Sequence, residues 1–385
     1  MLPFEFYNPT RIVFGEGKIA ELDRLVPRNA KVLVLIGGGS VEKNGTLAEV
    51  RAALGTRAYS IFRGIEPNPT FETLMEAVAQ VRREGIDFLL AVGGGSVLDG
   101  TKFVAAAVPW SGDPWEFMVD HGKNVKTALP VGTVLTLPAT GSESNSTGVI
   151  TRKSLKAKLF FASEATYPVF SILDPSKTFT LPERQVANGI VDAFVHVTEQ
   201  YLTCPAGGHV QDRFSEGLLS TLMELGPRVL AEPDNLEVRA NIMWAATLAL
   251  NGLIGAGVPQ DWGAHGIGHE ITALHGIDHA RSLTLVLPAL LEVRFEIKRA
   301  KLAQMAERVL GIHEGTEESR ARAAIFRMCT FFESMGCPTR LSACGLDAAA
   351  IPPLLRQLEA HGMTAMGEDK GQTLEVSRAI LEAAL

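Results

Sequence analysis

Three short apolar runs, each ending in a turn, constrain the fold of this chain more than any other feature. They span residues 31–36, 88–92 and 131–137; the first two end at Gly-Gly-Gly and the third at Pro138. Runs that are almost continuously apolar are typical of strands in a parallel sheet covered on both faces. Amphipathic stretches such as residues 70–84 lie between them. The order of strand, turn and helix predicts an α/β sheet with ligands at the carboxyl ends of its strands.

The second half of the chain follows a different pattern. After Asp174-Pro175 no strand is expected, because the remaining residues show only helical patterns interrupted by Gly and Pro. The expected helices span residues 183–203, 209–230, 236–255, 259–274, 280–294, 298–310, 316–335, 347–361 and 371–384. We therefore expect an α/β domain of residues 1–180 and an all-helical domain of residues 181–385, with a cleft near the boundary.

Composition and charge exclude several classes of protein. A chain of 385 residues with 46% hydrophobic and 21% charged residues is long enough for two globular domains. No apolar run is long enough to cross a bilayer, and no secretory signal is visible at the N-terminus. The net charge of −7 comes without a basic stripe, which argues against nucleic acid as a partner. The four cysteines form no CxxC pair, so we expect reduced thiols and a cytoplasmic location.

Two turns with the sequence Gly-Gly-Gly-Ser are candidates for a nucleotide site. They occupy residues 37–40 and 93–96, and a third turn at residues 136–142 follows the third strand. Glycines let the backbone turn sharply and approach a diphosphate, which helix N-terminal N–H groups can then face. Neither turn matches the G-x-G-x-x-G fingerprint in full, so a tight turn without a ligand is the alternative for each alone. Three such turns at successive strand ends favour a nucleotide.

The first turn also indicates which nucleotide is bound. Sites for NAD commonly place a carboxylate on the adenosine ribose, where it would repel a 2′-phosphate. Gly39 and Ser40 instead offer backbone N–H groups and a small hydroxyl, with Lys43 close behind, although Glu42 lies between them. We therefore expect NADP(H) as the cofactor.

Histidines and a carboxylate with metal-ligand spacing form a second candidate site. Asp192 and His196 are four residues apart in a predicted helix whose other face is apolar, so they share its polar face. Four of the nine histidines follow within fifteen residues: His265, His269, His275 and His279. Imidazoles and a carboxylate at these spacings suit one divalent transition metal. The spacing does not show which of the four histidines bind it, and the alternative is a cluster of interhelical hydrogen bonds.

These motifs resemble those of the iron-containing (group III) alcohol dehydrogenases. Within that family the chain is most similar to bacterial NADPH-dependent, broad-specificity aldehyde reductases and butanol dehydrogenases. The similarity covers essentially the whole chain, and its most specific parts are residues 9–15 (Pro-Thr-Arg-Ile-Val-Phe-Gly), 93–99 (Gly-Gly-Gly-Ser-Val-Leu-Asp), 137–145, 181–200 and 259–288. It implies an α/β dinucleotide-binding domain and an all-helical metal domain, an architecture shared with dehydroquinate synthase.

The resemblance also implies roles for individual residues. The metal ligands would be Asp192, His196, His265 and His279. The pyrophosphate contacts would be Gly94, Gly95 and Ser96, and further nucleotide contacts Thr136, Thr140, Ser142 and Lys158. With the first turn, Gly37, Gly38, Gly39 and Ser40, and with Asp99, they complete the expected cofactor site. Relatives that use NAD carry Asp where this chain has Gly39.

His269 is the remaining candidate. It follows His265 by one helical turn, and the resemblance places it beside the metal without making it a ligand. Two roles remain open: it passes a proton to the alkoxide, or it orients a ligand through a hydrogen bond.

The combined prediction is an NADP(H)-dependent alcohol dehydrogenase that mainly reduces aldehydes, has a broad substrate range and holds one Fe²⁺ or Zn²⁺. Hydride would pass from NADPH to a carbonyl carbon whose oxygen is polarised by the metal. One alternative is a lyase of the dehydroquinate synthase type, which needs cations for a sugar phosphate; Arg281 is the main candidate. Another is a nucleotide-binding regulatory protein whose structural metal has a coordination shell closed by the protein.

The N-terminal segment predicts self-association. Residues 4–7 and 11–14 have the character of exposed edge strands, which the family covers by pairing between subunits. We therefore expect a homodimer with a small-molecule substrate and no membrane or nucleic-acid partner.

Overall fold

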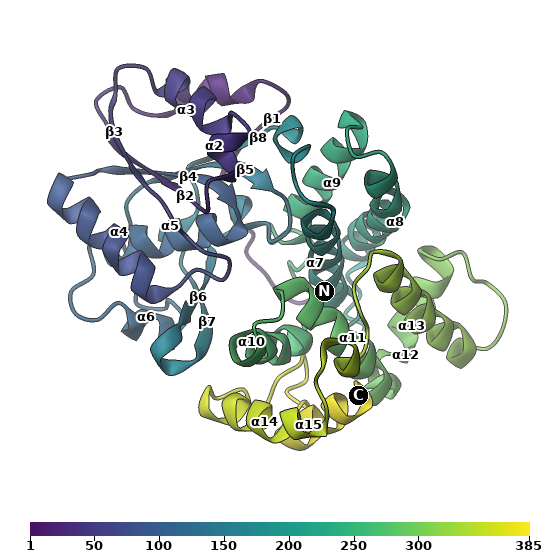
Figure 1. Cartoon of the computed structure of the whole chain (residues 1–385). Helices are drawn as coiled ribbons and strands as arrows, with labels where there is room; N and C mark the ends of the chain where they lie inside the picture. The colour runs from purple at the N-terminus through teal and green to yellow at the C-terminus, as the bar shows by residue number, and fades with distance from the viewer. The chain divides into compact units, whose positions relative to one another are not determined.

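The computed structural model describes all 385 residues, and the chain divides into two compact units (Figure 1). We call residues 7–182 and 233–247 the α/β unit. Residues 1–6, 183–232 and 248–385 form the helical unit. None of the helices is both long and apolar enough to cross a membrane.

A six-stranded sheet lies at the centre of the α/β unit, and every pairing in it is parallel. The strand order is β1-β8-β5-β4-β2-β3. The strands are β1 (Arg11–Phe14), β2 (Lys31–Ile36), β3 (Ala58–Phe62), β4 (Phe88–Gly94), β5 (Val131–Leu137) and β8 (Phe170–Leu173). The three apolar runs of the sequence are β2, β4 and β5, so the predicted parallel α/β sheet is confirmed.

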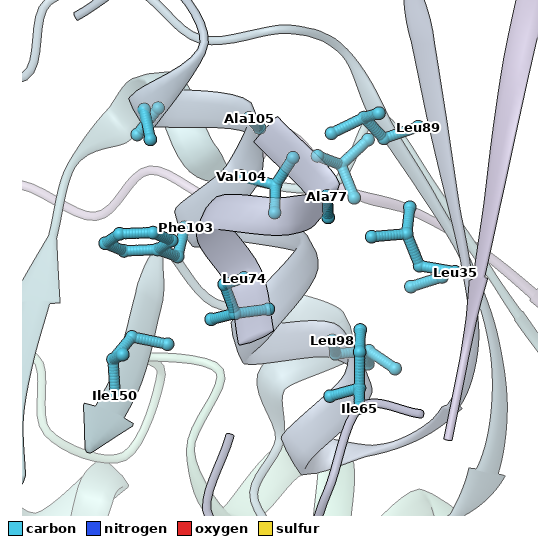
Figure 2. Close-up of a cluster of buried hydrophobic side chains, with 14 of the residues drawn as sticks. Leu35, Ile65, Leu74, Ala77, Leu89, Leu98, Phe103, Val104, Ala105 and Ile150 are labelled. Atoms are coloured by element: carbon cyan, nitrogen blue, oxygen red, sulfur yellow. The ribbon is translucent and has the colours of Figure 1, made fainter. Parts of the chain in front are cut away.

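Side chains of β2 alternate between the two faces of the sheet, and both faces are covered by helices. Leu33 and Leu35 of β2 are buried in a cluster with residues of α4 and α5. Figure 2 shows Leu35 and Leu89 facing the helices of this cluster. Val32 and Val34 are buried in a second cluster with η1, α1 and α3. These helices are η1 (Lys18–Glu21), α1 (Leu22–Leu25), α3 (Thr46–Leu54), α4 (Phe71–Glu84) and α5 (Gly95–Ala107). The almost continuous apolar run of β2 follows from this double burial.

From Glu183 onward every element is a helix, as the sequence predicts, and the α-helices are longer than the two short 3-10 helices at residues 341–344 and 348–350. The α-helices are α7 (Glu183–Tyr201), α8 (His209–Ala231), α9 (Leu236–Ala249), α10 (Gly263–His275), α11 (His279–Val293), α12 (Phe295–Arg308), α13 (Glu317–Ser334), α14 (Ile351–Ala360) and α15 (Leu374–Ala383). The largest difference from the predicted bounds is in α9, which ends before the turns at residues 250–257.

Most of α9 belongs to the α/β unit although it follows residue 180 in the sequence. Met243 is fully buried in the same cluster as Leu35. The Thr247 hydroxyl donates a hydrogen bond to Glu143 Oε1 at 2.6 Å, and the Trp244 ring packs edge-on against Phe14. These contacts attach residues 233–247 to the sheet-containing unit. Residues 1–6 group with the helical unit, where the Leu2 N–H donates to the Gly257 carbonyl.

Two segments lie outside the six-stranded sheet. Residues 11–14 form the edge strand β1, whereas residues 4–7 pair with no strand of this chain, and their pairing between subunits stays a prediction. Pro3 and Pro9 flank that segment, and proline cannot donate to a strand ladder. The basic stretch at residues 151–158 lies within an antiparallel hairpin of β6 (Thr147–Arg152) and β7 (Ala157–Ala162), which the sequence does not predict.

Candidate metal centre and nucleotide site

The connections of the sheet place a topological switch point between β2 and β4. The chain leaves β2 toward β3 on one side, whereas it leaves β4 toward β5 on the other. Gly37 to Gly39 follow β2, and Gly93 to Gly95 end β4 and begin α5, so both glycine turns lie at this point. In open α/β sheets ligands bind outside the carboxyl ends of strands at such a point.

Close packing requires glycine in the second turn. A Cβ atom on Gly95 would lie 2.5 Å from Thr140 Oγ1, and one on Gly94 would lie 2.9 Å from the Cβ of Leu137. Packing alone therefore explains why glycine occupies these two positions, whether or not a ligand binds there. The same packing brings the Thr140 side chain beside the N-terminus of α5, where the helix dipole favours an anion.

Asp99 holds the third turn against α5. The Ser142 hydroxyl donates to Asp99 Oδ1 at 2.6 Å, and the Val149 N–H donates to Oδ2 at 3.0 Å. Burial raises the pKa of this carboxyl above its ordinary value, against the opposing effect of Lys102. The Ser142 N–H in turn donates to Thr140 Oγ1. Asp99 thus links α5 to the segments that carry two expected nucleotide contacts.

Lys158 and Ser96 come together through Asn68. The Lys158 ammonium donates to Asn68 Oδ1 at 2.9 Å, and the Asn68 N–H donates to Ser96 Oγ at 3.3 Å. Lys158 is buried on β7, while Thr136 is buried near the end of β5. Asn68 therefore contacts both Lys158 of the β6–β7 hairpin and Ser96 of the second glycine turn.

The first turn has an open, polar environment. Gly39 adopts φ 94°, and Ser40 is exposed. Glu42 pairs with Arg63, whose Nη2 lies 3.1 Å from Glu42 Oε1. Arg63 directly follows β3, the strand beside β2, and this position in the sequence is the signal by which it could have been found. Since Arg63 offsets the charge of Glu42, the negative charge near this turn is balanced by a positive one.

Three helices of the helical unit bring four metal-ligand candidates together. Asp192 and His196 lie on α7, His265 lies in the first turn of α10, and His279 is the first residue of α11. One ligand atom from each lies within 4.8 Å of those from the others. Asp192 Oδ1 is 3.9 Å from His196 Nε2 and 3.6 Å from His279 Nε2. His275 is exposed at the end of α10 and is not part of the cluster.

The chemistry of this cluster fits a divalent metal. Burial lowers the pKa of His196 well below its ordinary value, so its imidazole is neutral and able to ligate. His265 Nε2 is buried and has no hydrogen-bond partner, an arrangement that is costly unless a ligand occupies it. Three imidazole nitrogens and one carboxylate match the donors that Zn²⁺ and Fe²⁺ take in proteins.

Further residues that the sequence did not single out brace the cluster. Asp278 precedes His279, and its Oδ2 accepts hydrogen bonds from Arg184 Nε at 2.8 Å and Asn188 Nδ2 at 2.9 Å. Arg184 and Asn188 continue, at four-residue steps, the polar stripe of α7 that carries Asp192. This spacing could have revealed them. Their contacts tie the start of α11 to α7.

His269 lies beside the cluster, one turn after His265 on α10. It is buried, and its ring centroid is 6.0 Å from that of His265 and 5.2 Å from that of His279. The placement agrees with both roles expected for it.

Comparison with known proteins identifies two matching family models. Residues 9–175 match the model described as iron-containing alcohol dehydrogenase. Residues 186–375 match the model for the C-terminal part of the Fe-containing alcohol dehydrogenase family.

Individual relatives match over almost their full lengths. The NADPH-dependent aldehyde reductase YqhD of Escherichia coli K12 is 58% identical over 383 residues, covering 99% of each chain. The probable NADH-dependent butanol dehydrogenase 1 of Bacillus subtilis is 37% identical over 390 residues, covering 100% of each. A crystal structure of E. coli K-12 YqhD superposes with a TM-score of 0.99 at 56% identity, covering 100% of this chain and 99% of that one. The structure of NADH-dependent butanol dehydrogenase A from Thermotoga maritima has a TM-score of 0.95 at 34% identity, with coverage of 100% and 99%.

Proposed function

Because this chain belongs to the iron-containing alcohol dehydrogenase family, we propose that it is an NADP(H)-dependent enzyme that mainly reduces aldehydes to primary alcohols. The observation that carries the proposal is the buried cluster of one carboxylate and three imidazoles in a chain 58% identical to an NADPH-dependent aldehyde reductase. The α/β domain of residues 1–180 would bind the nucleotide, and the helical domain of residues 181–385 would hold the metal.

Asp192, His196, His265 and His279 are the proposed ligands of one Fe²⁺ or Zn²⁺. A divalent ion held there supplies Lewis acidity toward a carbonyl oxygen. The residues contribute one negative charge and three neutral donors, so the loaded site keeps a net positive charge and favours developing negative charge on a substrate oxygen.

NADP(H) is the proposed cofactor, and it supplies the hydride when bound. The proposed contacts are Gly37, Gly38, Gly39, Ser40, Gly94, Gly95, Ser96, Asp99, Thr136, Thr140, Ser142 and Lys158. Gly39 leaves no carboxylate at the ribose position, and the Glu42 carboxylate is paired with Arg63. This local charge balance favours a 2′-phosphate. The 58% identical relative uses NADPH by name, whereas the 37% identical one uses NADH.

His269 is the proposed proton donor to the product oxygen. It is buried beside His265 and His279, two of the proposed ligands. The proposed ligand set already has four members without His269. A positioned acid typically contributes ~10²- to 10⁴-fold in rate.

A homodimer is the proposed assembly. β1 lies at the edge of the sheet, and a cavity of about 380 Å³ beside it is lined by Ile12, Phe14, Ala240, Asn241 and Trp244. Phe14 and Trp244 are both more than a third exposed. Pairing with a second β1 would cover the unpaired strand edge and these rings. All four cysteines are free thiols, which agrees with a cytoplasmic location.

The family matches favour an oxidoreductase over the lyase alternative. Arg281, its main candidate for binding a sugar phosphate, has its Nε only 3.8 Å from the Asp278 carboxylate. Its charge is therefore partly offset.

The test measures metal content and activity on the same samples. Purified protein should contain about one divalent ion per chain and oxidise NADPH with a panel of uncharged aldehydes. His265→Ala should lose most bound metal and nearly all turnover while its affinity for NADP⁺ remains. Full metal occupancy in that variant would remove His265 from the ligand set, and metal-loaded protein without turnover on any aldehyde would contradict the proposed activity.

A further inference from the structure

Glu199 is a buried carboxylate that the proposed function does not use. It lies on α7, seven residues after Asp192 and three after His196, on the same polar face of the helix. Only 1% of its side chain is exposed. A buried charge of this kind is costly unless hydrogen bonds satisfy both of its oxygens.

Both oxygens of Glu199 are used at the start of α10. Oε1 accepts hydrogen bonds from the backbone N–H groups of Ala264 at 2.8 Å and His265 at 3.3 Å. Oε2 contacts His265 Nδ1. An ionised carboxylate can only accept hydrogen bonds, so Nδ1 must carry the proton and donate it. The other ring nitrogen, Nε2, then carries the lone pair, and it is the atom without a hydrogen-bond partner.

We propose that Glu199 is the positioning residue for His265, holding its imidazole in the tautomer and orientation that present Nε2 as a metal ligand. This inference rests on the ligand set of the proposed function. One helix then supplies two ligands and the group that orients a third. Carboxylates that hold a ligating histidine in this way typically change metal affinity by about 10- to 100-fold.

A purely structural role for Glu199 is capping of α10, because its charge also lies at the positive end of that helix. Asp261 separates the two roles. Its Oδ1 accepts from the Gly263 N–H at 2.8 Å, so it serves the same helix end, and its Oδ2 pairs with Lys298. It makes no hydrogen bond to the imidazole of His265. Asp261→Asn is therefore a matched control that weakens the cap without touching the ligand.

Glu199→Gln is the informative variant because an amide has a single acceptor oxygen. Its NH₂ group must face either the backbone N–H groups or the imidazole. In the second case His265 changes tautomer and Nε2 carries a proton, which prevents ligation. Glu199→Asp keeps the charge on a shorter side chain and tests whether a carboxylate restores metal binding.

The measurement is the affinity of the purified full chain for Co²⁺ and Zn²⁺, by competition with a chelator, together with the visible absorption of bound Co²⁺. We expect Glu199→Gln to weaken affinity about 10- to 100-fold and to change the Co²⁺ spectrum. Glu199→Asp should recover part of the loss, and Asp261→Asn should leave affinity nearly unchanged at a similar drop in Tm. Equal losses of affinity in Glu199→Gln and Asp261→Asn would overturn the proposal.

Nitrogen-15 NMR of histidine-labelled, Zn²⁺-loaded wild type gives a second test if Glu199→Gln fails to fold. The His265 resonance, assigned by its loss in His265→Ala, should show a proton on Nδ1 and none on Nε2. A proton on Nε2 would overturn the role of Glu199. If the wild type binds neither ion, the proposed function itself fails. If the wild type binds and Glu199→Gln binds equally well, only this inference fails.

Discussion

At the scale of single residues, the backbone angle of Gly39 affects any substitution that is used to test cofactor preference. Its φ of 94° lies where side chains are rarely found, so any substitution carries a backbone cost. A Cβ atom there would also lie 3.5 Å from Glu42 Oε2. A charged variant therefore has to be compared with a neutral one of the same shape.

Gly39→Asp should shift preference from NADPH toward NADH relative to Gly39→Asn. Both variants carry similar backbone strain, but only Asp places a negative charge against the 2′-phosphate. We expect the ratio of kcat/KM for NADPH over NADH to fall about tenfold or more between them, equivalent to ~1.4 kcal/mol. A wild type with the higher kcat/KM for NADH would show the assignment of NADP(H) to be wrong.

His269→Ala should lower kcat by ~10²-fold or more while metal content stays intact, because a positioned proton donor is lost. The pH dependence of kcat should also flatten. His275→Ala, at the exposed end of the same helix, is the control and should retain activity. Loss of metal in proportion to activity would instead assign His269 to orienting a ligand.

At the scale of elements, the turn from β4 to α5 is determined by what packs beside it. The segment after β5 approaches so closely that Gly95 has no room for a side chain, while Asp99, one turn into α5, bonds Ser142 of that segment. Helix α5 and the segment after β5 are therefore held together by packing and by a hydrogen bond. A disturbance at Gly95 should therefore reach Thr140 and Ser142.

Gly95→Ala should both destabilise the protein and weaken NADPH binding, because its new methyl group would lie 2.5 Å from Thr140 Oγ1. Overpacking of this kind typically costs about 1 to 3 kcal/mol. Thermal unfolding and the KM for NADPH report the two effects. Gly217→Ala on α8, whose Cβ meets nothing within 4 Å, is the control. Wild-type values of both quantities in Gly95→Ala would contradict close packing at this turn.

At the scale of the whole molecule, the unpaired edge of β1 predicts assembly. Light scattering should give about twice the chain mass of 41.4 kDa. Trp244→Asp should shift the particle toward a monomer, because a charge would enter the apolar surface beside β1. Val119 on α6 (Trp115–Val119) is 62% exposed elsewhere in the same unit, so Val119→Asp should leave the dimer intact. A 41 kDa wild-type particle at micromolar concentration would refute the dimer.

The sequence by itself determined the features that depend on neighbours along the chain. Strands β2, β4 and β5 could be predicted because double burial produces continuous apolar runs. Asp192 and His196 could be placed on one face of α7 because a four-residue step returns to the same side of a helix.

Only the tertiary structure decided which distant side chains meet. Spacing made His265, His269, His275 and His279 equal candidates, and a resemblance rather than spacing favoured the first and last. The fold brings these two to Asp192 and leaves His275 exposed at the end of α10. The pairing of Glu199 with His265 likewise spans 66 positions. Such contacts depend on which helices pack together, and local periodicity shows which face of a helix is buried but not which distant helix covers it.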